Sequence, residues 1–235
     1  MVNSYVALDF ETTGLSAKED KVIEIGALKV IDGEITDTIS TFVDPCVKIP
    51  GRITELTGIT DAHVAGAPKD KEAMKNLLDF CEDLVILGHN IRFDYSFLKV
   101  WATNNKIVFD RECIDTLRIA RKVLPDLPSR SLDFLTSHFD LLHEEKHRAL
   151  SDAKAAAILY EDVLKKKYDG NEAAFEPVRF DMKFKKQSDI TPKQIKYLKD
   201  LIARYGIDPE CEIESLTKNA ASRMIDRIRF EYGGR

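Results

Sequence analysis

Three separate segments of the 235-residue chain carry carboxylates and a histidine that could form one site. Asp9 and Glu11 lie two residues apart in YVALDFETTGL (residues 5–15), so a strand there would present both carboxylates on one face. Asp94 lies in GHNIRFDYSFL (residues 88–98), and His147 and Asp152 lie in HRALSD (residues 147–152). Like charges on a buried strand need a cation to neutralise them, and carboxylates with one histidine favour a hard divalent ion over zinc or iron.

Each of these residues also has an ordinary structural explanation. Asp9 and Glu11 could be solvated acids at a strand end. Asp94 could be an acid favoured by the dipole at a helix start, His147 a surface histidine and Asp152 a helix cap. Strand ends and helix starts of one sheet converge in space, however, so the three segments together favour a single site.

The spacing of His147 and Asp152 adds a geometric condition. Residues five apart on a helix lie about 140° apart around its axis. The two side chains can therefore enter one site only if His147 lies in a loop and Asp152 lies in the first turn of the following helix.

The predicted elements would bring these segments together. A short apolar run predicts a buried strand that begins at residue 5 and ends in a tight turn at residues 12–14. Alternating apolar residues predict strands at 21–31 and 35–43, and Asp32-Gly33 between them indicates a hairpin. Short apolar runs predict buried strands at 84–87 and 113–117, and helices are expected over 70–81, 92–101, about 117–124, 131–139 and 149–167. A meander followed by strands that alternate with helices predicts a mixed α/β sheet with helices on its faces.

The last part of the chain differs from the body. Residues 168–187 have no clean period and are expected to form a linker. Thr191-Pro192-Lys193-Gln194 is typical of a helix start, and a second helix is expected near Thr217, so residues 188–235 form a predicted small helical module. Residues 178–235 carry 13 basic and 9 acidic side chains, a net charge of +4, whereas the remainder carries −9. This asymmetry favours a polyanionic partner for residues 178–235, with an ordinary mixed surface as the alternative.

Composition excludes several classes of protein. No apolar run is long enough to cross a membrane, and the first residues lack the pattern of a signal peptide. The four cysteines are scattered and form no paired motif, which favours reduced thiols and a cytoplasmic location over a disulfide framework or a zinc site.

The ordered motifs DFETTGL, HNIRFDYSFL and HRALSDA resemble the three motifs of the DnaQ-like (DEDDh) 3′–5′ exonucleases. That family includes the proofreading epsilon subunit of bacterial DNA polymerase III and the exonuclease domain of PolC-type polymerases. ITELTGIT (residues 53–60) also resembles a substrate-contacting loop of the family. The resemblance covers about residues 1–167, and it implies an RNase H-like fold with a five-stranded mixed sheet.

The resemblance also implies a mechanism, which is two-metal phosphodiester hydrolysis with two Mg²⁺ ions, or Mn²⁺ in their place. It assigns Asp9 to both ions, Glu11 and Asp152 to the first, and Asp94 to the second through water. His147 would be the general base. The terminal nucleotide would be held by two groups of residues, Thr12, Thr13, Gly14 and Leu15 in the turn, and Asn90, Phe93 and Phe97 in a pocket. Core packing is the alternative for the two phenylalanines.

The expected function is removal of nucleoside monophosphates, one at a time, from the 3′ end of DNA in proofreading or repair. The charge of −9 on the body argues against tight binding of duplex DNA, so a single-stranded or frayed end is the expected substrate. A DNA polymerase is a candidate partner, and the helical module is expected to add substrate affinity.

Three alternatives remain open. Exoribonucleases acting on short RNA share these motifs, and nothing in the sequence reads a 2′-hydroxyl group. A non-catalytic module that binds nucleic acid or a polymerase would keep the fold and lose the chemistry. Finally, HEEKH (residues 143–147) matches the H-E-x-x-H signature of zinc metalloproteases, but it is predicted to precede a helix instead of lying inside one, and no third ligand stands out.

Overall fold

The computed structural model describes residues 1–143, 145–167, 170, 172–207, 209 and 212–233. The chain divides into two compact units, Met1–Pro45 with Ile49–Lys183, here called the body, and Cys46–Lys48 with Phe184–Arg235. Among the described helices none has the length and apolar character needed to cross a lipid bilayer.

A six-stranded mixed sheet forms the centre of the body, in the order β3-β2-β1-β4-β5-β6. Strand β1 (Tyr5–Thr12) lies between its antiparallel partner β2 (Val22–Ile31) and its parallel partner β4 (Val85–Gly88). Strand β3 (Glu34–Phe42) pairs with β2, and β5 (Glu112–Asp115) runs parallel to β4. The predicted hairpin turn is confirmed, since Asp32 and Gly33 have φ values of 50° and 88°, the left-handed pair that a tight hairpin needs.

The sixth strand corrects the expectation of five strands. Strand β6 (Val178–Arg179) pairs antiparallel with β5 and lies within the stretch that was expected to be a linker. The same stretch contains α8 (Glu172–Phe175), whose Phe175 is buried in the core of the body. Two strand residues are too few to show an alternating pattern, so this part of the body could not be identified from periodicity. Residues 168, 169 and 171 of the predicted linker lie outside the described residues.

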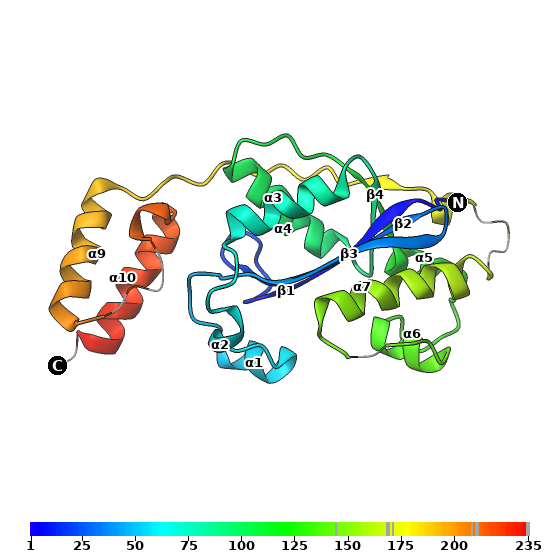
Figure 1. The fold of residues 1–235 in the computed structure, drawn as a ribbon, viewed down its shortest axis with the longest axis horizontal. Coiled ribbons are helices and arrows are strands. Elements are labelled where there is room, and N and C mark those ends of the chain that lie inside the picture. The colour runs from blue at the N-terminus through cyan, green and yellow to red at the C-terminus, as the bar shows by residue number, and fades with distance from the viewer. Residues whose placement is uncertain (144, 168–169, 171, 208, 210–211, 234–235) are drawn as a thin grey trace. The chain divides into compact units, whose positions relative to one another are not determined.

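Alternate residues of β1 face two different helical layers. Val6, Leu8 and Phe10 pack in the core that includes α3 (Asp70–Cys81) and α4 (Arg92–Asn104). Tyr5 and Ala7 pack in the core that includes α5 (Thr116–Val123) and α7 (Ala149–Ile158), which continues as the π-helix η1 (Leu159–Leu164). Figure 1 shows α3 and α4 on one side of the strands and α7 on the other. Asp9 and Glu11 have the same parity as Tyr5 and Ala7, so they lie on the α7 side of the sheet.

Two predicted helix starts in the body are set by side-chain caps. Ser131 Oγ accepts a hydrogen bond from Phe134 N and begins α6 (Leu132–His138), as the sequence predicts. Asp115 caps α5 in the same way, through Leu117 N. The strand expected over 113–117 therefore ends at Asp115, because this side chain starts the helix instead.

Two short helices follow the hairpin, α1 (Gly51–Thr57) and α2 (Asp61–Val64). They pack through a small cluster that includes Ile59, Val64 and Ile23 of β2. The ITELTGIT segment (residues 53–60) therefore forms most of α1 and the connection to α2.

The second unit has its own core. Helices α9 (Pro192–Tyr205) and α10 (Lys218–Tyr232), with the short 3₁₀ helix η2 (Ile213–Ser215), bury a cluster that includes Leu198, Leu201 and Ile228. The predicted cap is present, since Thr191 Oγ1 accepts from Gln194 N and Gln194 Oε1 accepts from Thr191 N.

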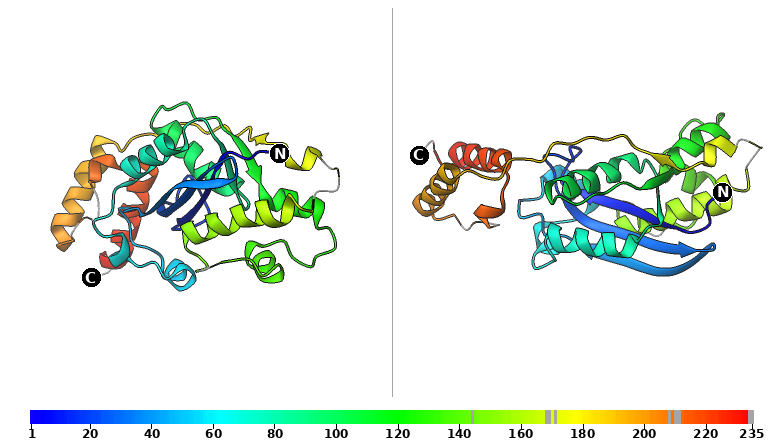
Figure 2. Two further views of the ribbon diagram at one scale, coloured as in Figure 1. Left: turned by 45° about the vertical axis from the view of Figure 1, so that its right-hand side comes forward. Right: turned by 90° about the horizontal axis from the view of Figure 1, so that it is seen from above.

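Figure 2 shows the helices of the body on both faces of its sheet from two further directions.

Candidate divalent-metal site

The first two carboxylates lie at the end of β1, next to β2. In the β1–β2 register Asp9 is opposite Gly26 and Glu11 is opposite Glu24, and the strand is irregular between Glu11 and Thr12. Both acids are half-buried. Both side chains therefore lie on the α7 side of the sheet, next to the irregularity at the end of β1.

The start of α7 supplies the next two side chains. Helix α7 begins at Ala149, Asp152 lies in its first turn and His147 precedes it, which meets the geometric condition derived from their spacing. Ligand atoms of Glu11, His147 and Asp152 all lie within 4.8 Å of one another. His147 has a φ of 57°, in the left-handed region that a histidine adopts at some energetic cost.

Asp94 reaches the site from the opposite helical layer. It lies in the first turn of α4, is only 3% exposed, and its Oδ1 accepts a hydrogen bond of 3.0 Å from Phe10 N of β1. Asp9 and Asp94 are not among these three residues. Burial, and then the negative charge of Asp94, raises the pKa of Asp9, so the two carboxylates interact. The three sequence segments thus meet at one end of β1.

Burial and mutual repulsion raise the pKa values of these acids. The pKa of Asp9 lies well above its ordinary value because of burial, and then because of the charges of Asp94 and Asp152. Burial, followed by the charge of Asp152, raises the pKa of Glu11 to about 8. Burial also raises the pKa of Asp94 to about 8. Oxygen ligands that repel one another fit a divalent cation, which would remove this repulsion.

These shifts predict how the stability of the metal-free protein depends on pH. A carboxyl group whose pKa is higher in the folded than in the unfolded state binds more protons when folded, so stability falls as pH rises between the two values. With EDTA present, we expect Tm to fall from about pH 5.5 to about pH 8, and Mg²⁺ to raise Tm more at the higher pH. The measurement is thermal unfolding at both pH values. Glu11→Gln should reduce the fall of Tm with pH in EDTA and should also reduce the extra stabilisation that Mg²⁺ gives at the higher pH. Equal changes in Tm for this variant and the wild type would contradict the prediction.

Glu24 is a further acid of the site that the sequence analysis did not select. Its carboxylate, 2% exposed, accepts hydrogen bonds from Arg148 Nη2 at 2.8 Å and from Ala149 N at 3.1 Å. The hydrogen bond to Glu24 raises the pKa of Arg148. Glu24 thus holds Arg148, the residue next to His147, and Ala149 N, the first backbone amide of α7. A charged residue inside the apolar strand VIEIGAL was the signal that could have identified it.

Gly26 allows α7 to approach the sheet. A Cβ atom at this position would lie 2.0 Å from both Ala149 C and Leu150 N. Such a contact is far shorter than any van der Waals separation, so the helix start can lie against β2 only because residue 26 has no side chain.

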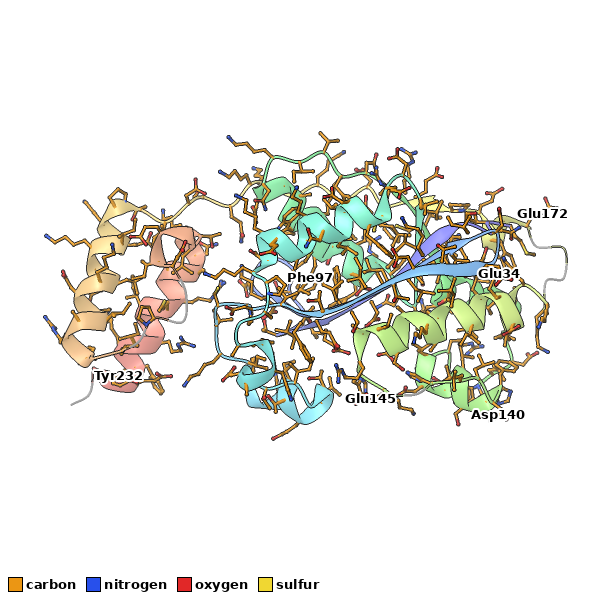
Figure 3. All side chains as sticks on the ribbon, in the orientation of Figure 1. Glu34, Phe97, Asp140, Glu145, Glu172 and Tyr232 are labelled. Carbon is orange, nitrogen blue, oxygen red and sulfur yellow. The ribbon has the colours of Figure 1, made fainter. Side chains whose placement is uncertain are left out.

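His143 is the second residue that the sequence analysis did not assign to the site. Its Nε2 lies 2.5 Å from Asp152 Oδ1. The HEEKH stretch precedes α7, as expected, and Figure 3 shows Glu145 beside the start of that helix. Glu144 lies outside the described residues. The stretch therefore lacks the helical arrangement of the H-E-x-x-H metalloproteases.

The turn after β1 is held by its own polar side chains. Thr12 Oγ1 donates to Gly14 O at 2.7 Å, and Thr13 Oγ1 accepts from Lys21 N at 3.0 Å. Gly14 lies against the Asp20 carboxylate, which an added Cβ would meet at 2.6 Å. Leu15 is 86% exposed. The two threonines are therefore engaged in shaping the turn, whereas the Leu15 side chain is free to meet a ligand.

The three residues expected to line a pocket differ in exposure. Asn90 is exposed, with a φ of 63°, and its N donates to Asp115 Oδ1 at 3.0 Å. Phe93 is half-buried, and its ring centroid lies 5.1 Å from that of Phe97. Phe97 is buried in the core on the α4 side of the sheet, where Figure 3 labels it. The buried ring of Phe97 thus packs against the ring of Phe93, which is the more exposed of the two.

Comparisons with known proteins show what this chain is similar to. The exonuclease family RNase_T matches residues 6–160. The DNA polymerase III PolC-type of Clostridium perfringens is 43% identical over 164 residues, which cover 70% of this chain and 11% of that protein. The corresponding protein of Thermotoga maritima is 38% identical over 233 residues, which cover 97% of this chain and 16% of that protein. This chain therefore spans only a small part of the length of these relatives.

A solved structure also matches the body. Exonuclease X in complex with 5′-overhanging duplex DNA is 26% identical, with a TM-score of 0.55, and the match covers 68% of this chain and 91% of that chain. The RNase H-like exonuclease fold is thereby confirmed, with six strands in place of five.

Proposed function

This chain belongs to the RNase_T exonuclease family, and we propose that it is a metal-dependent 3′–5′ exonuclease that releases nucleoside monophosphates from DNA. The observation that supports this proposal most directly is the group formed by Glu11, His147 and Asp152, whose ligand atoms lie within 4.8 Å of one another. A like-charged cluster of half-buried acids around this group has the character of a divalent-metal site.

Each residue of the site has a distinct proposed role. Asp9, Glu11 and Asp152 would hold two Mg²⁺ ions directly, and Asp94, already bonded to Phe10 N, would act on the second ion through water. When bound, the ions supply Lewis-acid stabilisation of the attacking and leaving oxygens. His147 would accept the proton of the attacking water, since imidazole exchanges protons near neutral pH. Mn²⁺ is expected to substitute for Mg²⁺.

The residues near the site suggest how the 3′ end is held. The exposed Leu15 would lie against the terminal base, with the backbone of Thr12, Thr13 and Gly14 along the sugar. Phe93 would stack on a base with Asn90 beside it, and stacking of this kind is worth about 1–3 kcal/mol per base. The acidic body favours a single-stranded or frayed end over a duplex.

The test is a direct assay of the purified chain. Single-stranded DNA and RNA of one sequence, labelled at the 5′ end, are incubated with Mg²⁺, with and without EDTA, and the products are resolved over time. We expect a ladder that shortens from the 3′ end, faster for DNA and absent with EDTA. Faster cleavage of RNA would make the chain an exoribonuclease. No cleavage of either with Mg²⁺ or Mn²⁺ would favour the non-catalytic binding module.

We propose that residues 188–235 add affinity for the substrate through their basic side chains, since this module carries 9 basic and 8 acidic residues whereas residues 1–177 carry a net charge of −9. The described members of the body's two main core clusters all precede residue 183, so truncation after residue 187 leaves those clusters complete. The truncated chain should show a higher KM, a smaller dependence of KM on salt and an unchanged kcat. Unchanged KM and salt dependence would contradict this role.

We propose a DNA polymerase as the partner, since the relatives of this chain are PolC-type polymerases of which it spans only a small part. Surface plasmon resonance with the replicative polymerase of the source organism would test this. Absence of binding would make the chain a nuclease that acts alone.

A further inference from the structure

His143 contacts Asp152 but is not a member of the group formed by Glu11, His147 and Asp152. It comes from the connection between α6 and α7, and its side chain is 5% exposed. Its Nε2 lies 2.5 Å from Asp152 Oδ1, so one carboxylate oxygen of Asp152 is engaged by a buried histidine. A hydrogen bond to an ionised acceptor is shorter and stronger than one between neutral groups.

The other side of the imidazole ring is also held. His143 Nδ1 lies 3.3 Å from Thr136 Oγ1 and 3.8 Å from Asp133 Oδ1, both on α6. Thr136 is itself buried, and its hydroxyl donates to Leu132 O at 2.9 Å. The ring is therefore fixed between α6 and the first turn of α7, and its two nitrogens face defined partners.

Asp152 needs such an anchor because it lies close to the acids of β1. Its charge raises the pKa values of Asp9 and Glu11, so without a bound cation these carboxylates repel one another. A carboxylate held at one oxygen cannot rotate away from this repulsion, and its second oxygen then points in a fixed direction. Partners behind metal ligands orient them in this way in many metal sites.

We propose that His143 is a positioning residue, which holds Asp152 Oδ1 through its Nε2 and leaves Oδ2 directed at the divalent-metal site. This role rests on the proposed function of that site. His143 touches neither the substrate nor the ion and acts through Asp152, whereas His147, the other histidine of HEEKH, is the proposed general base.

The test compares metal binding in three variants by titration calorimetry with Mn²⁺ alone, which requires no cleavage. His143→Leu removes the N–H donor, and His143→Gln keeps an N–H donor on a side chain of similar length. His138→Gln is the matched control, because His138 is an exposed histidine that ends α6 and stacks on Phe134. We expect His143→Leu to weaken Mn²⁺ binding about 10–100-fold, His143→Gln to recover most of it, and His138→Gln to match the wild type.

The outcomes separate this proposal from the proposed function. A folded His143→Leu variant with wild-type affinity for Mn²⁺ would overturn the positioning role. If that variant does not fold, His143→Phe, which also lacks the N–H donor, replaces it. Wild-type affinity of this variant for Mn²⁺ then overturns the role, and a loss of 10-fold or more, about 1.4 kcal/mol, supports it. A wild-type chain that binds Mn²⁺ and cleaves no nucleic acid would contradict the proposed exonuclease while leaving the role of His143 tested.

Discussion

Replacing Asp9 with asparagine is expected to lower kcat by about 10²–10³-fold or more while preserving the binding of single-stranded DNA. Burial raises the pKa of Asp9, and so do the charges of its acidic neighbours, Asp94, Asp152, Glu11 and Glu24. The variant loses an ionised oxygen ligand, which impairs catalysis. It also loses one of several mutually repelling charges, so its Tm without metal should exceed that of the wild type at about pH 8. The measurements are single-turnover cleavage, a binding titration in EDTA and thermal unfolding.

Asp79→Asn is the control for Asp9→Asn. Asp79 lies on α3, its side chain is 70% exposed, and it pairs only loosely with Lys75 at 3.9 Å. This change should alter neither cleavage nor stability measurably, as is usual for exposed charges. Cleavage by Asp9→Asn at the wild-type rate would show that the carboxylates of β1 do not form the catalytic site.

Replacing Gly26 with alanine should have the second-largest effect on kcat, although Gly26 has no proposed role in binding the substrate. The added Cβ would lie 2.0 Å from Ala149 C and Leu150 N, so the start of α7 must move away from β2. That movement displaces His147 and Asp152 together, and a misplacement of about 1 Å can cost about 10²-fold in rate. Overpacking of this kind also costs typically about 1–3 kcal/mol of stability. We expect kcat to fall about 10²-fold and Tm to fall with it.

Gly51→Ala is the matched control for Gly26→Ala. A Cβ at Gly51, the first residue of α1, would meet no atom within 4 Å. Rate and Tm should therefore stay close to those of the wild type. If Gly26→Ala kept full activity, the close approach of α7 to β2 would not determine the geometry of the site.

Local sequence signals predicted those features that depend on neighbouring residues. Asp32-Gly33 predicted the hairpin because few residue pairs tolerate two left-handed conformations. Thr191 and Gln194 predicted the start of α9 because their side chains bond to each other's backbone amides. The alternation of β1 placed Asp9 and Glu11 on one face, and the spacing of His147 and Asp152 fixed where α7 had to begin.

Features that depend on distant contacts were missed for a physical reason. Val178 and Arg179 form a strand only because Cys113 and Glu112 offer an open sheet edge. Glu24 is acceptable in an apolar strand only because Arg148 and Ala149 supply donors from far along the chain. His143 is linked to Asp152 by the path of a loop, and no periodic pattern encodes such a path.

The central position of β1 also fixes when the site can form. Its antiparallel partner β2 follows it directly in the chain, but its parallel partner β4 and its covering helix α7 come from much later segments. As the chain leaves the ribosome, the hairpins of β1, β2 and β3 can pair early, because local contacts close quickly. Their carboxylates stay without His147 and Asp152 until α7 has been synthesised and has docked. The proposed site therefore forms late in folding, after nearly the whole body has emerged.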